Sequence, residues 1–509
     1  MKRVYSHRHK YTKKLKRYGN NRKRAESKTG GKVLASGGFG CVFTPALKCA
    51  DSSSRESDTV TKLMTEKHAV EEYAEVNEIR EKIDKIPNYR DYFLINDLKL
   101  CKPAELTASD LENFDSKCRA LTKAKFTKKN INGKLGELMA LNMPYGGVSV
   151  ETYIYDGGSC EKIYKVHVSL VDLLKHGIIP MNKMDIYHCD IKSSNVLVDV
   201  KADSIKTRLI DWGLSTEYVP FKNETFPKTW RNRPFQFNVP FSVIIFSDIF
   251  VEKYTKYIHS GGKQEETDLK IFVIDYVTFW MKKRGAGHYK FINEIMLALF
   301  GHGITTVKKE SKPKIVETQI TMAFISNYIV DVLLHYTKFK SDGSLDLREY
   351  LDNVFIKIVD IWGYMCIYCP IVEIFSNNYS VLNEREMKVF NMLKYMFIEY
   401  LYNPRHEPVN MDAFFKDLDD LGDLLHSTFA KITTKDATKD ATKGVTKDTT
   451  KDTTKDATNA LAKGISLKHK INDNKHDKTK KMARINSRLS FKRPPKRHSF
   501  RKPIFLALK

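Results

Sequence analysis

Residues 187–213 constrain this chain more than any other stretch, because two short apolar runs each carry polar residues in a fixed pattern. The residues before the run 196–198 read H-x-D-x-K-x-x-N, and the run 208–210 ends in D-x-G. Carboxylate and amide oxygens, which both patterns supply, are ligands of a hard cation such as Mg²⁺. A plain β-hairpin, in which 196–198 pairs with 208–210 and polar residues occupy the turns, is the alternative interpretation.

The combined pattern resembles the catalytic centre of protein kinases. By this resemblance Asp190 accepts the proton of the substrate hydroxyl, and Lys192 contacts the γ-phosphate of ATP. Asn195 and Asp211 would hold Mg²⁺, and His188 would support the loop without acting as a base. These few side chains are enough for phosphoryl transfer, because the reaction depends mainly on positioning the reactants and on neutralising the phosphate charge.

A glycine-rich stretch near the N-terminus resembles the loop with which kinases cover the ATP phosphates. Backbone amides approach the phosphates there because glycine leaves no side chain in the way. Lys62, in the run 59–64, resembles the strand lysine that pairs with the α- and β-phosphates. The nucleotide-binding residues predicted from the loop are Leu34, Ala35, which replaces the first glycine of the family, Ser36, Gly37, Gly38, Phe39, Gly40, Cys41 and Val42.

The stretch 66–86 predicts a helix, because apolar residues recur at spacings of three and four before Pro87 ends it. An active kinase needs a glutamate from this helix to orient the strand lysine. We predict Glu75, which borders the apolar face of the helix. Glu72 and Glu78 remain alternatives, since they lie on the same side.

Residues 141–147, with the sequence L-N-M-P-Y-G-G, resemble the kinase hinge that receives adenine through backbone groups. By that alignment Met143 is the gatekeeper at the back of the adenine pocket. Tyr145 and Gly146 would lie beside the adenine. An ordinary exit from a strand into a turn is the alternative interpretation of these residues.

Three features around the catalytic pattern bear on control and architecture. Cys189 replaces the arginine that pairs with an activation-loop phosphate in many kinases, so we expect competence without that phosphate. Residues 231–241 stand where most kinases have A-P-E, so we expect a rebuilt peptide-docking floor. The D-x-W of 360–362 resembles the start of the helix that anchors the catalytic loop, which makes residues of about 250–350 an insertion.

The resemblance implies an α+β fold: a bilobal protein-kinase fold with a small β-rich N-lobe and a large helical C-lobe, plus disordered basic tails. From 434 onward the chain repeats T-K-D-A-like units with period four, which sustains no amphipathic stripe, so we expect a disordered spacer. The predicted boundaries are a basic arm at 1–28, a kinase domain at 29–430 with lobes of about 29–145 and 146–430, a linker at 431–459 and a basic tail at 460–509.

Positive charge is concentrated at the two ends of the chain. The net charge is +25 overall, +11 for residues 1–28 and +14 for 460–509, whereas 29–430 carries −2. Basic tails bind polyanions, nucleic acid among them, by releasing counterions without reading sequence. Tyrosines interleaved in the arm are suited to stacking on bases. A solvated tail with a role in nuclear import or solubility is the alternative.

The cysteines and the hydropathy pattern suggest an intracellular setting. The 8 cysteines form no dense framework and follow no secretory signal, which favours a reducing compartment. Cys366 and Cys369 have C-x-x-C spacing within an apolar run, which indicates buried thiols rather than a metal site. No stretch reaches about 18 apolar residues, so we expect no membrane span.

Several local sequences, among them A-S-G-G-F-G-C-V-F, M-P-Y-G-G and H-C-D-I-K-x-x-N, are similar to serine/threonine kinases encoded by large DNA viruses such as insect iridescent viruses. This resemblance implies ATP and Mg²⁺ as cofactors and protein substrates with Ser or Thr acceptors. It also implies a location in the host-cell cytoplasm or nucleus, or in the virus particle. A pseudokinase scaffold and a basic nucleic-acid-associated virion protein are the two alternatives.

Overall fold

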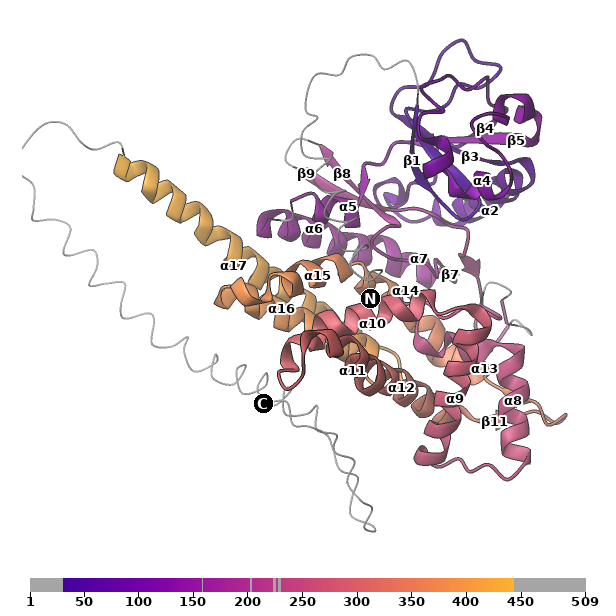
Figure 1. Ribbon diagram of the computed structural model, residues 1–509, viewed down its shortest axis with the longest axis vertical. Coiled ribbons are helices and arrows are strands. Elements are labelled where there is room, and N and C mark those ends of the chain that lie inside the picture. The colour runs from indigo at the N-terminus through magenta and orange to yellow at the C-terminus, as the bar shows by residue number, and fades with distance from the viewer. Residues whose placement is uncertain (1–30, 158, 202–203, 223–225, 228–229, 444–509) are drawn as a thin grey trace, which may run out of the picture.

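The structure, a computed structural model, describes residues 31–157, 159–201, 204–222, 226–227 and 230–443. The predicted basic arm at 1–28, the linker beyond 443 and the basic tail at 460–509 lie outside the described residues. A small β-rich part, formed by the first third of the chain, adjoins a larger part made mostly of helices (Figure 1). The predicted α+β class is therefore confirmed.

An antiparallel sheet organises the N-terminal part. Its 5 strands lie in the order β1-β2-β3-β5-β4. Side chains on both faces are buried, because Leu63 of the third strand packs with Phe43 on one face, and Met64 packs with Leu141 on the other. The strands are β1 (Lys32–Ser36), β2 (Gly40–Thr44), β3 (Thr59–Thr65), β4 (Lys99–Cys101) and β5 (Leu138–Pro144).

Residues 102–137, which we call the cap, cover the sheet face on which Leu63 lies. The cap contains the short helices α3 (Phe114–Lys117) and α4 (Arg119–Lys123). Phe114 and Leu121 of these helices are buried in the same cluster as Leu63. On the opposite face lies α2 (Glu66–Ile83), which ends three residues before the predicted helix end. The cap is therefore part of the N-terminal core.

The prediction of a reducing environment implied free thiols, and the structure contradicts this for four cysteines. Disulfides join Cys41 to Cys118 and Cys49 to Cys101. The partners lie 77 and 52 residues apart in sequence and meet only when the cap and β4 pack on the sheet, so their spacing gave no signal. The cysteines that remain free are Cys160, Cys189, Cys366 and Cys369.

Helices form most of the C-terminal part, together with short strands. A three-stranded sheet contains β6 (Val148–Ser149), β8 (Val196–Lys201) and β9 (Ser204–Leu209), and two-stranded sheets pair β7 (Ile186–Tyr187) with β10 (Thr216–Glu217) and β11 (Lys338–Phe339) with β12 (Leu345–Asp346). The helices are α5 (Val150–Tyr155), α6 (Cys160–Asp172), α7 (Ile179–Lys183), α8 (Asp248–His259), α9 (Glu266–Arg284), α10 (Gly287–Phe300), α11 (Lys312–Ile315), α12 (Met322–Tyr336), α13 (Arg348–Tyr350), α14 (Ile356–Cys366), α15 (Cys369–Asn377), α16 (Glu384–Phe397) and α17 (Met411–Lys443).

The predicted insertion at about 250–350 is filled by helices that belong to the helical core. Tyr328 of α12 meets Trp362 of α14 edge to face, with ring centroids 5.6 Å apart. Helix α9 packs against α12 in turn. The stretch Arg348–Asn377 is long and apolar enough to cross a membrane, but 89% of its most apolar window is buried inside the protein. Cys366 and Cys369 lie in this stretch as buried thiols, as predicted.

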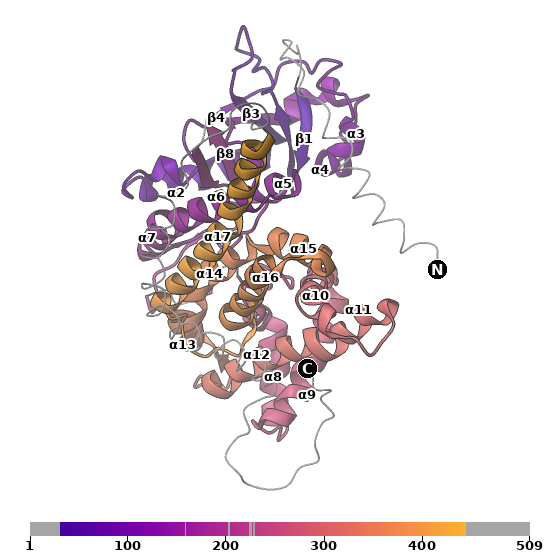
Figure 2. The same ribbon diagram turned by 90° about the vertical axis from the view of Figure 1, so that its left-hand side faces the viewer.

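Helix α17 corrects the predicted linker. It lies along α6 and α16 (Figure 2) and buries Phe414, Leu418, Leu421 and Leu425, which recur at spacings of four and three. The helix then continues to Lys443, so residues 431–443 are helical and not a disordered spacer. Extending an existing helix adds one hydrogen bond per residue without a new nucleus, which offsets the weak helix propensity of the threonines.

Candidate active site

The loop between β7 and β8 is fixed from below by a buried carboxylate. Asp360 of α14 is 1% exposed. Its two oxygens accept the backbone N–H groups of His188, at 2.9 Å, and Cys189, at 2.8 Å. The Nδ2 of Asn182 donates a third bond at 2.8 Å. The predicted role of the D-x-W helix in anchoring this loop is therefore confirmed.

Asp190 is the most densely hydrogen-bonded residue of the loop. One carboxylate oxygen accepts bonds from Lys192 Nζ at 2.7 Å and from Asn195 Nδ2 at 2.9 Å. The other accepts a bond from Asn238 Nδ2 at 2.8 Å. Burial raises the pKa of Asp190, but Lys192 and the donated hydrogen bonds outweigh burial, so the pKa lies below its usual value. The carboxylate is therefore ionised at neutral pH.

His188 supports the loop, as predicted. The ring is fully buried, and its Nε2 lies 3.1 Å from the carbonyl oxygen of Ile210. The N–H of Asp190 donates to the Nδ1 atom at 3.3 Å, which requires the proton on Nε2. Burial lowers the pKa of this imidazole. His188 is thus a neutral link between the loop that carries Asp190 and the strand end that carries Asp211.

Asn195 and Asp211, the predicted metal ligands, are brought together by the β8–β9 hairpin. Val196 pairs with Leu209, and the N–H of Ile210 donates to the carbonyl oxygen of Asn195 at 2.9 Å. The hairpin interpretation and the catalytic interpretation are therefore compatible. Asp211 is exposed, and its carboxylate makes no hydrogen bond or ion pair with another group among the described residues. Such an oxygen donor beside an amide fits Mg²⁺, a hard cation.

Lys62 lies on β3 and pairs with a glutamate of α2, but not with the predicted one. Its Nζ lies 2.6 and 2.7 Å from the two carboxylate oxygens of Glu72. Both side chains are mostly buried, at 16% and 18% exposure. Glu75, which we predicted for this role, is exposed, so the prediction of Glu75 is wrong.

The helix geometry explains why Glu72 is the partner. An α-helix turns about 100° per residue, so Glu72 lies in line with the buried residues Val76 and Ile83. Glu75 lies about 60–70° outside that stripe by the same count. The prediction placed the glutamate at the border of the apolar face, whereas the pairing needs the centre of that face.

Replacing Glu72 with glutamine is expected to lower kcat/KM for phosphate transfer by about 10- to 100-fold, because Lys62 loses the charge that orients it. Glu75→Gln, three residues further along the same helix, is expected to leave kcat/KM unchanged. Initial rates at varied ATP concentration test both variants. Equal losses in the two variants, or a loss confined to Glu75→Gln, would contradict the assignment of Glu72.

The glycine-rich turn joins β1 to β2, where the N–H of Gly37 donates to the carbonyl oxygen of Gly40 at 2.9 Å. Side chains on Gly37 and Gly38 would meet almost nothing, whereas one on Gly40 would collide with Met64 and the backbone of Leu63. The tip residue Phe39 is 61% exposed. The turn is thus open at its tip and close-packed at its base.

The predicted nucleotide-binding residues of this turn divide between the two sheet faces. Val42 is paired with Lys62 across the ladder, so both side chains lie on the same face. Cys41 lies on the other face, in its disulfide with the cap. The Cys41 side chain therefore points away from the face of Lys62, because neighbouring strand residues point to opposite faces, and only its backbone remains a predicted nucleotide contact.

The segment predicted as the hinge runs close to the helical part. A side chain on Gly146 would collide with Leu94 and Leu197, which explains the glycine. The N–H of Tyr145 donates to the carbonyl oxygen of Asp58 at 2.8 Å, and the predicted place of Tyr145 beside an adenine stays a prediction. The Tyr145 side chain is exposed.

The register between β3 and β5 bears on Met143, the predicted gatekeeper. Leu141, 1% exposed, pairs directly with Lys62, whereas Met143 pairs with Val60 two positions nearer the strand end. Residues opposite each other in an antiparallel ladder share a face and touch. Leu141 therefore lies directly beside Lys62 on the same face of the sheet, and the gatekeeper role of Met143 stays a prediction.

Residues 230–238 hold the catalytic loop from the side of the helical part. The indole N–H of Trp230 donates to Cys189 Sγ at 3.0 Å, and Arg233 donates to the Cys189 carbonyl oxygen at 3.0 Å. Asn238 bonds Asp190, as described, and the carbonyl oxygen of Ile191 at 3.2 Å. Asn238 lies in the segment 231–241 that replaces A-P-E, but no motif predicted its contact with Asp190.

Comparison with protein-family models finds no match for this chain, and comparison with curated proteins finds none either. The assignment of function therefore rests on the residues and their geometry.

Proposed function

We propose that this protein is a protein kinase with a bilobal fold, which transfers the γ-phosphate of ATP to serine or threonine hydroxyls of protein substrates. The observation that carries the proposal is the ionised, buried Asp190, held between Lys192, Asn195 and Asn238 in a loop anchored by Asp360. A carboxylate fixed by donors on both oxygens has the defined orientation that a general base requires.

The other groups required for phosphoryl transfer have candidates around this base. Lys62, oriented by Glu72, would pair with the α- and β-phosphates of ATP. Asn195 and Asp211 would hold Mg²⁺, which supplies charge neutralisation on the phosphate oxygens when it is bound. Lys192, which contacts Asp190 and is 25% exposed at its side chain, would reach the transferred phosphate.

We also propose that the kinase is competent without phosphorylation of its activation segment. Cys189 cannot pair with a phosphate, and burial raises the pKa of its thiol well above the usual value. Trp230 and Arg233 hold the loop at this position through contacts within the chain. On the resemblance alone, we propose expression of this kinase in cells infected by a large DNA virus.

The test is transfer of ³²P from γ-labelled ATP to casein, to myelin basic protein and to the protein itself, followed by phosphoamino-acid analysis. We expect Mg²⁺-dependent labelling of serine or threonine that EDTA abolishes and that prior phosphatase treatment of the enzyme leaves unchanged. ATP binding without any transfer would refute the kinase proposal and favour a pseudokinase scaffold. Loss of transfer after phosphatase treatment would refute phosphate-independent competence alone.

A further inference from the structure

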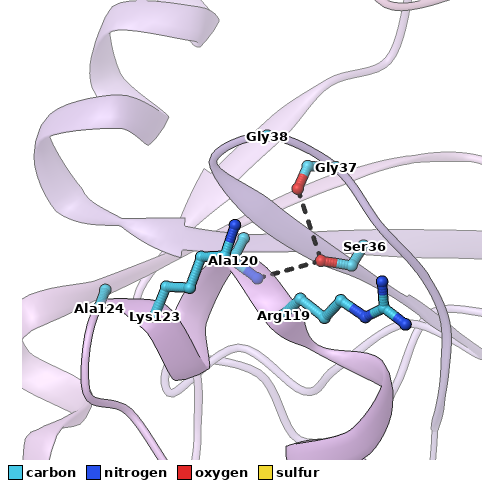
Figure 3. A pocket seen from close by; sticks show the side chains of 7 residues that line it. All are labelled: Ser36, Gly37, Gly38, Arg119, Ala120, Lys123 and Ala124. Carbon is cyan, nitrogen blue, oxygen red and sulfur yellow. Dashed lines mark hydrogen bonds between the residues drawn. The ribbon is translucent and has the colours of Figure 1, made fainter. Parts of the chain in front are cut away.

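A pocket of about 520 Å³ lies between the glycine-rich turn and α4 of the cap (Figure 3). Its charged wall is α4, from which Arg119 and Lys123, about one helical turn apart, extend toward the glycine-rich turn. The other residues that line the pocket are Ser36, Gly37, Gly38, Ala120 and Ala124. The pocket therefore combines two cations with small side chains that leave room for a ligand.

The pocket lies on the cap side of the sheet, away from Lys62. Ser36 pairs with Cys41 across the β1–β2 ladder, so both side chains lie on the same face. Cys41 is joined to Cys118 of the cap by a disulfide. Lys62 pairs with Val42, the neighbour of Cys41, and therefore lies on the opposite face. A ligand of this pocket is thus distinct from a nucleotide bound at Lys62.

The two walls of the pocket are joined before any ligand binds. The N–H of Ala120 in α4 donates a hydrogen bond to the Ser36 hydroxyl of the turn at 3.2 Å. The disulfide of Cys118, the residue before Arg119, ties the start of α4 to β2. A site whose walls are already held in place loses less conformational entropy on binding than one that has to be assembled.

No acidic residue lines the pocket, although the cap contains 8 lysines and arginines and 5 acidic residues. Within the part of the chain that the structure describes, Arg119 and Lys123 form no ion pair with an acidic side chain. The acidic residues of the cap all have partners elsewhere: Glu105 accepts a bond from Asn132, Asp110 pairs with Arg55, Glu112 pairs with Lys32, Asp115 accepts the N–H of Lys128, and Glu137 pairs with Lys134. The charge of the two pocket cations is therefore available to a ligand.

We propose that this pocket binds a phosphate group with two negative charges, carried either by phosphoserine in a protein or by a small phosphorylated molecule. Two cations match the charge of a dianion, whereas a carboxylate would neutralise only one of them. The guanidinium of Arg119 has the fork geometry that fits two phosphate oxygens, and Lys123 adds a point charge. The small side chains of the wall offer no apolar anchor, so charge and hydrogen bonds supply the affinity.

The test measures fluorescence anisotropy of a labelled peptide with one central phosphoserine, titrated with the full-length protein without ATP. A salt concentration of about 0.15 M screens attraction to distant charges. We expect the double variant Arg119→Ala/Lys123→Ala to weaken Kd by at least about tenfold, because two charge-assisted hydrogen bonds are lost. The matched control, Lys128→Ala/Lys129→Ala, removes the same charge from exposed lysines of the cap that do not line the pocket. Its Kd is expected to stay within about twofold of wild type.

Competition by free O-phosphoserine distinguishes the two sources of the phosphate group. If free O-phosphoserine displaces the peptide at concentrations near the Kd of the peptide, the pocket recognises the phosphate group alone and suits a small phosphorylated molecule. If the peptide binds at least about tenfold more tightly, contacts beyond the phosphate contribute and the ligand is a phosphorylated protein segment. Both results support a phosphate site at Arg119 and Lys123.

Three outcomes would overturn the proposal. In the first, the phosphoserine peptide does not bind. In the second, it binds no more tightly than the same peptide with an unmodified serine. In the third, the pocket variant and the Lys128→Ala/Lys129→Ala control have the same Kd, which would indicate attraction to the charge of the cap as a whole. Since the assay contains no ATP and measures no transfer, its result is independent of the kinase proposal.

Discussion

Asp190→Asn is expected to lower kcat for phosphate transfer by about 10²- to 10⁴-fold, which is the usual contribution of a general base. Asparagine has nearly the same shape and keeps one oxygen to accept a bond from Lys192 or Asn238. It cannot take the proton of the substrate hydroxyl. The KM for ATP is expected to stay within about threefold of wild type, because the base contacts the acceptor and not the nucleotide. Steady-state kinetics at saturating ATP measures both quantities.

The matched control for this variant is Asp185→Asn, five residues upstream. Asp185 has a positive φ, of 60°, a conformation that asparagine tolerates as well as aspartate does. We expect wild-type kcat for the control and similar melting temperatures for both variants. A fully active Asp190→Asn protein would show that another group takes the proton. A loss shared equally by both variants would point to a general effect of altering this region.

The parts of the site that sequence could predict are the ones carried by short contiguous motifs. Asp190, Lys192 and Asn195 lie in one loop, and the spacing within a loop fixes which side chains meet. Asp360 was predictable from its resemblance to a D-x-W motif, although it lies inside α14 and not at the helix start that the resemblance implied. In each case a local sequence pattern determines how the side chains of the motif lie relative to one another. Long-range packing only places the motif within the fold.

Other parts of the site depend on how elements pack, which no local pattern records. Glu72 and Glu75 both lie near the apolar face of the helix, and the rotation of α2 against β3 decides which of them meets Lys62. Asn238 reaches Asp190 because the segment after residue 230 packs against the catalytic loop. Cys41 and Cys118 are joined only because the cap covers that sheet face.

Asp360→Ala is expected to lower the free energy of unfolding by about 3–9 kcal/mol, since it removes the acceptor of three donors at about 1–3 kcal/mol each. Two of these donors are the backbone N–H groups of His188 and Cys189, whose positions define the loop. A loss of this size is comparable with the whole stability of many proteins. Urea unfolding followed by tryptophan fluorescence measures it.

Two further variants test this prediction if Asp360→Ala does not fold. Asp360→Asn retains one carbonyl acceptor, so it is expected to fold with an intermediate loss of stability. Its kcat is expected to fall, because the loop loses one of its two backbone anchors. Asp248→Ala removes an exposed carboxylate that pairs with Arg231 at 2.6 Å, and solvent screening limits its effect to under about 1 kcal/mol. If Asp360→Asn and Asp248→Ala destabilise the protein equally, Asp360 does not anchor the catalytic loop. If Asp360→Asn loses stability but keeps its kcat, Asp360 anchors the loop without positioning Asp190. Catalysis would then tolerate the loss of the hydrogen bond at His188 or Cys189.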